Sequence, residues 1–169
     1  MTRLTNAEFT ALLQRNPDVS APDAELRNTG ALGCAQPAAY RLTAASAPTE
    51  HEEQAALFAW ADEVEPMRPE LGMMFAIPNG GARHPAVGAM LKTEGVRAGV
   101  PDVFLAVRRG QWGGLFVEMK RADKRNHATA EQERWIAALR QYGYMAVVCY
   151  GCTEAQQAIM AYLQQEVQP

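Results

Sequence analysis

The segment RAGVPDVFLAVRRGQWGGLFVEMKR, residues 97–121, places charged residues in and beside two strongly apolar runs. Asp102 comes directly before the run VFLAV, and Glu118 and Lys120 lie within LFVEMK. Both runs have the near-continuous apolar character of strands that are covered on both faces. Burying an ionised side chain without a partner is costly, so three charges at these positions require a common explanation. A divalent metal ion would supply one.

The spacing predicts that these three side chains meet. Glu118 and Lys120 are two positions apart, so both leave the same face of a strand, while Leu115, Val117 and Met119 leave the other. The loop RRGQWGG predicts a hairpin that brings the second strand alongside Asp102. Carboxylates are hard ligands for Mg²⁺ or Mn²⁺, and an ammonium group stabilises phosphate charge. The alternative is a surface strand with an ordinary Glu118–Lys120 salt bridge, which the apolar runs disfavour.

Outside this segment, the sequence predicts an α/β fold in which helices flank a mixed β-sheet, in the order α-β-α-β-β-α-β-α. Thr49 and Thr129 are expected helix caps. The expected inward residues are Leu57, Trp60, Ala61 and Val64 on the first helix, and Trp135, Leu139 and Tyr142 on the third. The expected elements are helix 49–64, a strand within 71–77, helix 85–94, strands 103–107 and 115–120, a helix from 129, strand 145–150 and helix 153–163.

Length and composition predict one main domain. The chain has 169 residues, of which 48% are hydrophobic, enough for a single sizeable core. We expect an N-terminal arm or linker with a short helix at 1–48, the domain at 49–164 and a tail at 165–169. No apolar run reaches membrane-spanning length, and the N-terminus lacks the apolar region of a signal peptide. These features predict a cytoplasmic protein with no membrane partner.

Charge and cysteine content leave two questions open. The net charge is −3, but residues 83–125 carry nine basic and four acidic residues, which could attract phosphate or simply form a solvated face.

Cys149 and Cys152 form a Cys-x-x-Cys pair between a predicted strand and helix. A redox pair or a zinc site is one interpretation. Buried, inert thiols are the interpretation that we favour.

A family resemblance adds to these patterns. Asp102, followed sixteen residues later by Glu118-Met119-Lys120, resembles the Asp…Glu-x-Lys core of restriction-endonuclease-like nucleases, and the chain resembles the VRR-NUC family in particular. The matching elements cover about residues 49–164. In order, they are Glu53-Gln54, the turn IPNGG with Arg83, GVPD, GLFVEMK, Gln132 and GYMAVVCYG. The order of these elements makes the resemblance more specific than the Asp…Glu-x-Lys pattern alone.

The resemblance implies roles for individual residues. Metal ligands would be the carboxylates of Glu53, Asp102 and Glu118 and the main-chain carbonyl of Met119, and Lys120 would orient or deprotonate the attacking water. Glu53 is favoured over Glu50 and Glu52 because it lies on the apolar stripe of its helix. Stabilisation of the helix dipole is the alternative role for any of these glutamates. Gln132 would be either part of the active site or half of a capping box with Thr129.

The expected substrate is DNA. Amides of the turn at Asn79, Gly80 and Gly81, and the side chains of Arg83, Lys92 and Arg97, are candidate backbone contacts, with Arg108 and Arg109 as further candidates. The resemblance implies a Mg²⁺- or Mn²⁺-dependent DNA endonuclease acting on branched DNA such as four-way junctions or flaps. It also implies phage or prophage origin and a homodimer. A non-catalytic nucleic-acid-binding module is the alternative. Candidate dimer surfaces are MMFAI, residues 1–48 and the stripe Ile159, Met160 and Leu163.

Overall fold

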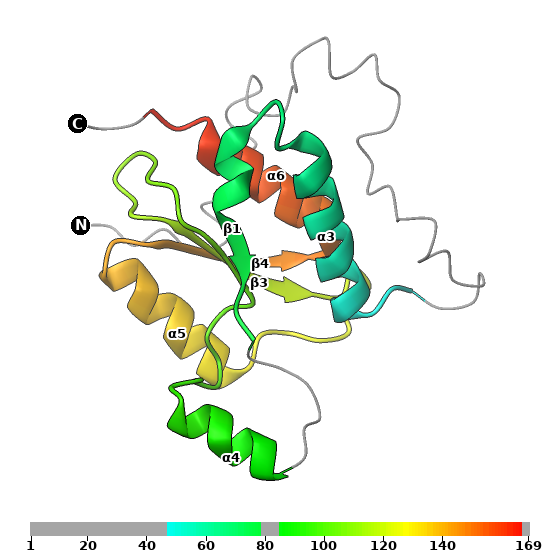
Figure 1. The fold of residues 1–169 in the computed structure, drawn as a ribbon, viewed down its shortest axis with the longest axis vertical. Helices are drawn as coiled ribbons and strands as arrows, with labels where there is room; N and C mark the ends of the chain where they lie inside the picture. Colours follow the sequence, from blue (N-terminus) through cyan, green and yellow to red (C-terminus); the bar gives the residue numbers. More distant parts are fainter. Residues whose placement is uncertain (1–46, 79–84, 167–169) are drawn as a thin grey trace.

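The computed structural model describes residues 47–78 and 85–166, whose elements follow the predicted order with one addition, the short 3-10 helix η2 (Figure 1). The short helix expected within residues 1–48 lies outside the described residues. Two predicted strands, 115–120 and 145–150, have the observed bounds. The elements are α3 (Glu50–Val64), η2 (Pro69–Met73), β1 (Met74–Ala76), α4 (Pro85–Thr93), β2 (Val103–Leu105), β3 (Leu115–Lys120), α5 (Ala130–Gln141), β4 (Met145–Tyr150) and α6 (Gly151–Leu163).

The four strands form one mixed sheet in the order β1-β2-β3-β4. β2 runs antiparallel to both β1 and β3, with Val103 opposite Val117, which confirms the predicted hairpin. β4 runs parallel to β3 and is reached through α5. The carboxyl ends of β3 and β4 therefore lie side by side, and Lys120 is the register partner of Tyr150.

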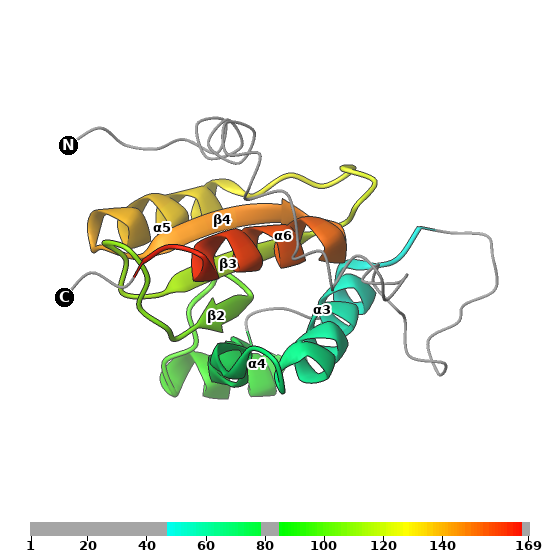
Figure 2. The ribbon, with the colours of Figure 1, turned by 90° about the horizontal axis from the view of Figure 1, so that it is seen from above.

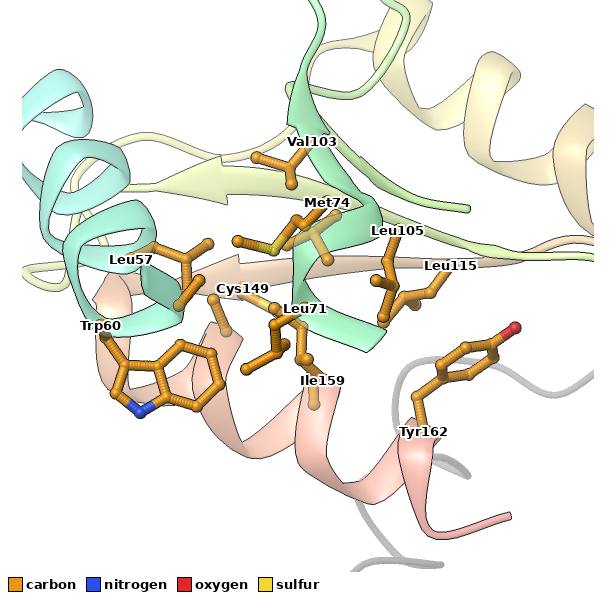
Figure 3. Close-up of a cluster of buried hydrophobic side chains, with 14 of the residues drawn as sticks. Leu57, Trp60, Leu71, Met74, Val103, Leu105, Leu115, Cys149, Ile159 and Tyr162 are labelled. Carbon is orange, nitrogen blue, oxygen red and sulfur yellow. The ribbon is translucent and has the colours of Figure 1, made fainter. Parts of the chain in front are cut away.

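The main core lies between the sheet and the helices α3 and α6 (Figure 3). Leu115, Val117 and Met119 are buried in it, as the strand alternation predicts. The opposite face of β3 carries Phe116, Glu118 and Lys120. Figure 2 shows α5 and α6 on opposite sides of β4. Glu118 and Lys120 thus leave the sheet on the face that α5 partly covers.

Helix α3 begins at a capping box. The Thr49 hydroxyl accepts from the Glu52 N–H, and the Glu52 carboxylate accepts from the Thr49 N–H at 2.7 Å. The predicted inward stripe is confirmed, since Leu57, Trp60, Ala61 and Val64 are all buried. Glu53 is also buried on this stripe. None of the helices in the described ranges is both long enough and apolar enough to cross a membrane.

The predicted inward face of α5 is wrong in part. Tyr142 is 81% exposed, because it is the C-cap residue and the helical spacing no longer governs its direction. Trp135 is half-buried, with its indole N–H donating to the Ala98 carbonyl at 2.9 Å. Ile136 is the buried residue of this helix. Gln132 and Leu139 are half-buried as well, so the predicted face of α5 is confirmed except for Tyr142, and Ile136 is added to it.

Candidate active site

The candidate active site lies where β2 begins and β3 ends. One position before the Val103–Val117 pair, the Asp102 carboxylate accepts a hydrogen bond of 2.9 Å from the main-chain N–H of Met119. This bond fixes Asp102 beside the strand that carries Glu118 and Lys120. The structure thus brings together the three charged residues of the segment 97–121.

Glu118 is the centre of this cluster, with 0% of its surface exposed. Its Oε1 atom accepts a hydrogen bond from Lys120 Nζ at 2.7 Å and another from Gln132 Nε2. Its Oε2 atom is buried and has no hydrogen-bond partner among the described residues. One carboxylate oxygen is therefore fully engaged, and the other is aimed at no protein donor in this part of the chain.

Both carboxyl groups are electrostatically strained. Burial raises the pKa of Glu118 to about 7, and the nearby Asp102 charge adds to this rise, while the hydrogen bond from Lys120 opposes it. Burial also raises the pKa of Asp102, against the hydrogen bond from the Met119 N–H. Burial thus penalises the ionised form of both acids, and an added positive charge would stabilise that ionised form.

Lys120 is also buried, with 5% of its surface exposed. Burial alone would lower its pKa, but the hydrogen bond and charge of Glu118, together with Glu50 and Asp102, raise it above its ordinary value. Glu50 Oε1 lies 3.7 Å from Lys120 Nζ. Lys120 is therefore held as an ammonium ion at neutral pH, which suits a role in binding phosphate charge.

Gln132 serves in two arrangements at once. Its side-chain oxygen accepts from the Thr129 N–H at 2.8 Å, and its main-chain N–H donates to the Thr129 hydroxyl at 3.3 Å, which completes a capping box. Its Nε2 group donates to Glu118 Oε1. The two roles that the sequence left open are compatible, because the amide oxygen serves the helix and the amide nitrogen serves the carboxylate.

The glutamates of α3 occupy different surroundings. Glu53 accepts a hydrogen bond of 2.8 Å from the Cys152 N–H in the first turn of α6. Gly151, with φ +82, lies beside it, and a Cβ there would be 3.5 Å from Glu53 Oε1. Glu50, which the sequence ranked lower, is the glutamate that approaches Lys120. The first turn of α3 and the end of β3 are far apart in the sequence, so local sequence patterns could not predict that Glu50 lies near Lys120.

The comparison with known families bears directly on this site. The VRR-NUC domain matches residues 47–153, a range that includes Asp102, Glu118, Lys120 and Gln132. The chain belongs to the VRR-NUC family. A solved structure titled "VRR_NUC domain protein" is similar to it, with 29% sequence identity and a TM-score of 0.63, over 73% of this chain and 94% of that one. A comparison with curated proteins gave no match.

Membership in the VRR-NUC family confirms the predicted α/β fold with a mixed sheet flanked by helices, the restriction-endonuclease-like core. The family is generally one of nucleases, so the domain is a nuclease-like domain whose expected substrate is DNA. The cluster around Glu118 lies within the matched range and on the strand pair that contains the Asp…Glu-x-Lys residues.

The carboxylates of this VRR-NUC domain fit a divalent cation. No group of three or more His, Cys, Asp or Glu residues within 47–78 and 85–166 is arranged to hold a metal ion. Mg²⁺, however, commonly keeps several waters and uses only one or two protein carboxylates. Asp102 and Glu118 form such a pair, with a buried oxygen, Glu118 Oε2, that lacks a hydrogen-bond partner among the described residues. Met119 and Glu53 remain predicted ligands.

The predicted DNA contacts divide into three groups. Asn79, Gly80, Gly81 and Arg83 lie outside the described residues. Lys92 and Arg97 are exposed near the end of α4, where Arg97 Nη1 donates to the Lys92 carbonyl at 3.4 Å. At the hairpin tip, Arg108 is exposed, whereas Arg109 donates to the Glu70 carboxylate at 2.6 Å and the Leu163 carbonyl at 3.1 Å. Arg109 therefore fastens the hairpin to η2 and α6.

Cys149 has the surroundings of a structural residue. Its side chain is buried in the main core. Burial raises the pKa of the Cys149 thiol above its ordinary value. A thiol with a raised pKa is a poor nucleophile, because the thiolate is the reactive form. For Cys149 these observations favour the inert interpretation over the redox one. Cys152, by contrast, is disulfide-bonded, so the expected free thiol is wrong for that residue, and its bond is not to Cys149.

Proposed function

We propose that the protein is a Mg²⁺- or Mn²⁺-dependent DNA endonuclease. The observation that carries this proposal is the buried Glu118 carboxylate, bonded to Lys120 and Gln132 through one oxygen, with its second oxygen lacking a partner among the described residues and Asp102 nearby. Such an arrangement lowers stability, and perturbed acids of this kind concentrate at functional sites. A surface salt bridge would need no such burial.

Each residue of the cluster has a defined task in this proposal. Asp102 and Glu118 would hold the cation, which when bound compensates negative charge and makes water more acidic. Gln132 and the Met119 N–H fix the directions of the two carboxylates. Lys120, kept protonated by Glu118, would bind a phosphate oxygen as charge accumulates during in-line displacement. The protein therefore contributes mainly position and electrostatics.

The deciding experiment is a cleavage assay on a panel of DNAs. Purified protein is incubated with linear duplex, single-stranded, flap and four-way-junction DNA in Mg²⁺, Mn²⁺, Ca²⁺ or EDTA. We expect internal cleavage in Mg²⁺ or Mn²⁺, none in EDTA, and none by Lys120→Ala. Arg134→Ala, which alters an exposed residue of α5, is the matched control and should cut normally. Binding without cleavage under every condition would instead favour the non-catalytic nucleic-acid-binding module.

The preferred substrate in this proposal is branched DNA, such as a four-way junction or a flap. This preference rests on the resemblance to compact VRR-NUC proteins, as do an origin in a phage or prophage and a place in the cytoplasm of a bacterial host. The same panel tests the preference. Branched substrates should be cut faster than a linear duplex of the same sequence, and equal rates would contradict the preference while leaving endonuclease activity in place.

We further propose that the protein acts as a homodimer, which would supply two sites for paired incision. Within MMFAI, Met73 and Phe75 are 53% and 49% exposed. These apolar side chains support MMFAI as an interface. In the predicted α6 stripe, by contrast, Ile159 and Leu163 are buried in the protein's own core. Light scattering after size-exclusion chromatography should give twice the 18.5 kDa chain mass. A measured mass equal to that of a single chain at micromolar concentration would contradict the dimer.

A further inference from the structure

A second group of polar side chains lies directly beside the candidate active site. Tyr150, the last residue of β4, is the register partner of Lys120 at the end of β3. Register partners on parallel strands project from the same face of a sheet. Tyr150 therefore leaves the face that carries Glu118 and Lys120, although none of the roles described above uses it.

Two exposed residues from the loop after β3 converge on Tyr150. His127 Nδ1 lies 3.2 Å from the Tyr150 hydroxyl, within hydrogen-bond distance. Lys124 Nζ lies 5.4 Å from the centre of the Tyr150 ring. Lys124 and His127 are both exposed, and Tyr150 is half-buried. These three residues, named the Tyr150 cluster below, present an ammonium, an imidazole and a phenol to solvent.

Lys124 differs from its basic neighbours in its pairing. Arg121 and Arg125 both pair with Asp123, at 2.9 and 3.4 Å. None of the ion pairs formed within the described part of the chain includes Lys124. Its positive charge is therefore available for a negatively charged ligand.

The backbone holds Lys124 in place. Its φ is 56°, in the left-handed region that residues other than glycine seldom occupy, and its N–H donates to the Arg121 carbonyl at 3.1 Å. A strained backbone conformation persists where the surrounding structure fixes it, and such sites often serve binding. A cation above an aromatic ring at an exposed site stabilises a fold only weakly. The contact between Lys124 and the Tyr150 ring therefore adds little to the stability of the fold, and a role in binding explains the geometry better.

We propose that the Tyr150 cluster binds a backbone phosphate of the DNA strand, next to the phosphate that Lys120 contacts. Lysine, tyrosine and histidine side chains are suitable partners for phosphate oxygens, and such contacts set the register of the protein on its DNA. The inference rests on the proposed nuclease function and adds to it a binding position on the β4 side of the site. Lys124 supplies the charge, and Tyr150 and His127 supply directed hydrogen-bonding groups.

Binding measurements at several salt concentrations test this proposal. The full chain and its variants are titrated against a fluorescent DNA duplex in EDTA, so that cleavage does not interfere. Lys124→Gln should weaken binding and reduce the slope of log K against log salt by about 0.9, because one phosphate contact is lost. Lys124→Arg should restore both values. Tyr150→Phe should weaken binding with little change in slope, since no charge is removed.

The control is Arg134→Gln, which removes an exposed charge from α5 outside the proposed contact and should leave slope and affinity unchanged. Thermal unfolding of each variant checks that the fold is intact. Wild-type affinity and slope in Lys124→Gln would overturn the proposal, as would an equal loss in Arg134→Gln.

A parallel cleavage assay in Mg²⁺ or Mn²⁺ separates this inference from the proposed function. If the wild type cuts DNA while Lys124→Gln binds and cuts as the wild type does, only the Tyr150 cluster is wrong. If the wild type binds DNA through Lys124 but cuts nothing, the endonuclease proposal fails and the phosphate contact stands. A wild type that binds no DNA would overturn both.

Discussion

Glu53 and Cys152 lie 99 positions apart in the sequence and are joined by a hydrogen bond of 2.8 Å from the Cys152 N–H to the Glu53 carboxylate. The N-cap residue of α6, Tyr150, makes no side-chain capping bond. Glu53 therefore supplies from α3 an acceptor and a negative charge at this helix N-terminus, in addition to Glu154, whose carboxylate accepts from the Tyr150 N–H at 3.0 Å. A residue predicted as a metal ligand thus has a structural task as well.

The first prediction follows from that bond. Glu53→Ala should lower the free energy of unfolding by about 1–3 kcal/mol, because the buried Cys152 N–H loses its acceptor. Glu63→Ala, an exposed change on the same helix, should stay within about 0.5 kcal/mol of the wild type. Urea unfolding in EDTA measures both. Indistinguishable effects would show that the Glu53–Cys152 bond does not stabilise the fold.

The second prediction concerns metal binding. Mg²⁺ or Mn²⁺ should raise the melting temperature, since a ligand that binds only the folded state stabilises it, and Ca²⁺ should bind without supporting cleavage. If Glu53 is a ligand, Glu53→Gln should reduce the Mn²⁺-induced rise, whereas Glu52→Gln should not. The same measurement on Glu50→Gln tests whether Glu50, the glutamate that approaches Lys120, contributes to the Mn²⁺-induced rise in melting temperature. Equal reductions in the Glu52 and Glu53 variants would contradict the choice of Glu53.

The third prediction separates catalysis from stability. Asp102→Asn and Lys120→Ala should each abolish cleavage. Asp102→Asn should also raise the melting temperature in EDTA, because it removes a charge next to Glu118 while its amide oxygen still accepts from the Met119 N–H. Differential scanning calorimetry and the junction-cleavage assay provide the two readouts. Cleavage by Lys120→Ala at the wild-type rate would contradict the assigned role of that lysine.

The fourth prediction is a pH dependence of stability. In the folded protein the Glu118 pKa is about 7, against an ordinary value of 4.5, so the folded state holds a proton that the unfolded state releases. This contribution is complete below pH 4.5 and is lost as pH rises through about 7, so the metal-free protein should become less stable across this window. Urea unfolding in EDTA at pH 5 and pH 8 measures the change.

A matched variant checks the source of that dependence. Glu118→Gln removes the titrating group and should flatten the decline between pH 5 and pH 8. Saturating Mg²⁺ should oppose the decline in the wild type, because a bound cation favours the ionised carboxylates. A wild type that becomes more stable over this range without metal would show that other groups dominate its titration.

Local patterns predicted much of this fold. Strands β3 and β4 are recognised by their apolar runs, and Thr49 and Thr129 by their capping chemistry, because these signals depend on neighbours within a few residues. The meeting of Asp102 with Glu118 was also predictable, since a short hairpin fixes which residues face each other. The same local logic placed Glu53 correctly on the buried stripe of α3.

Contacts between distant segments were not predictable in this way. The approach of Glu50 to Lys120 depends on how α3 packs against the end of β3, and the Glu53–Cys152 bond depends on the packing of α3 against α6. The outward direction of Tyr142 depends on where α5 ends, which spacing leaves uncertain by a residue or two. Tyr150 gave no signal as a neighbour of Lys120, because the register of parallel strands is set by packing across the whole sheet.

Arg140 affects how readily the edge of the sheet can pair with a strand from another copy of the protein. Its Nε and Nη2 groups donate to the Ala146 carbonyl of β4, the strand at one end of the sheet, at 2.9 and 2.6 Å. A carbonyl that accepts two guanidinium hydrogen bonds is a poor template for an incoming strand from another chain. The opposite end of the sheet is the three-residue strand β1, too short to template a long ladder. Arg140 therefore occupies one carbonyl of β4, and β1 offers only three residues, so both ends of the described sheet are poor templates for edge-to-edge pairing.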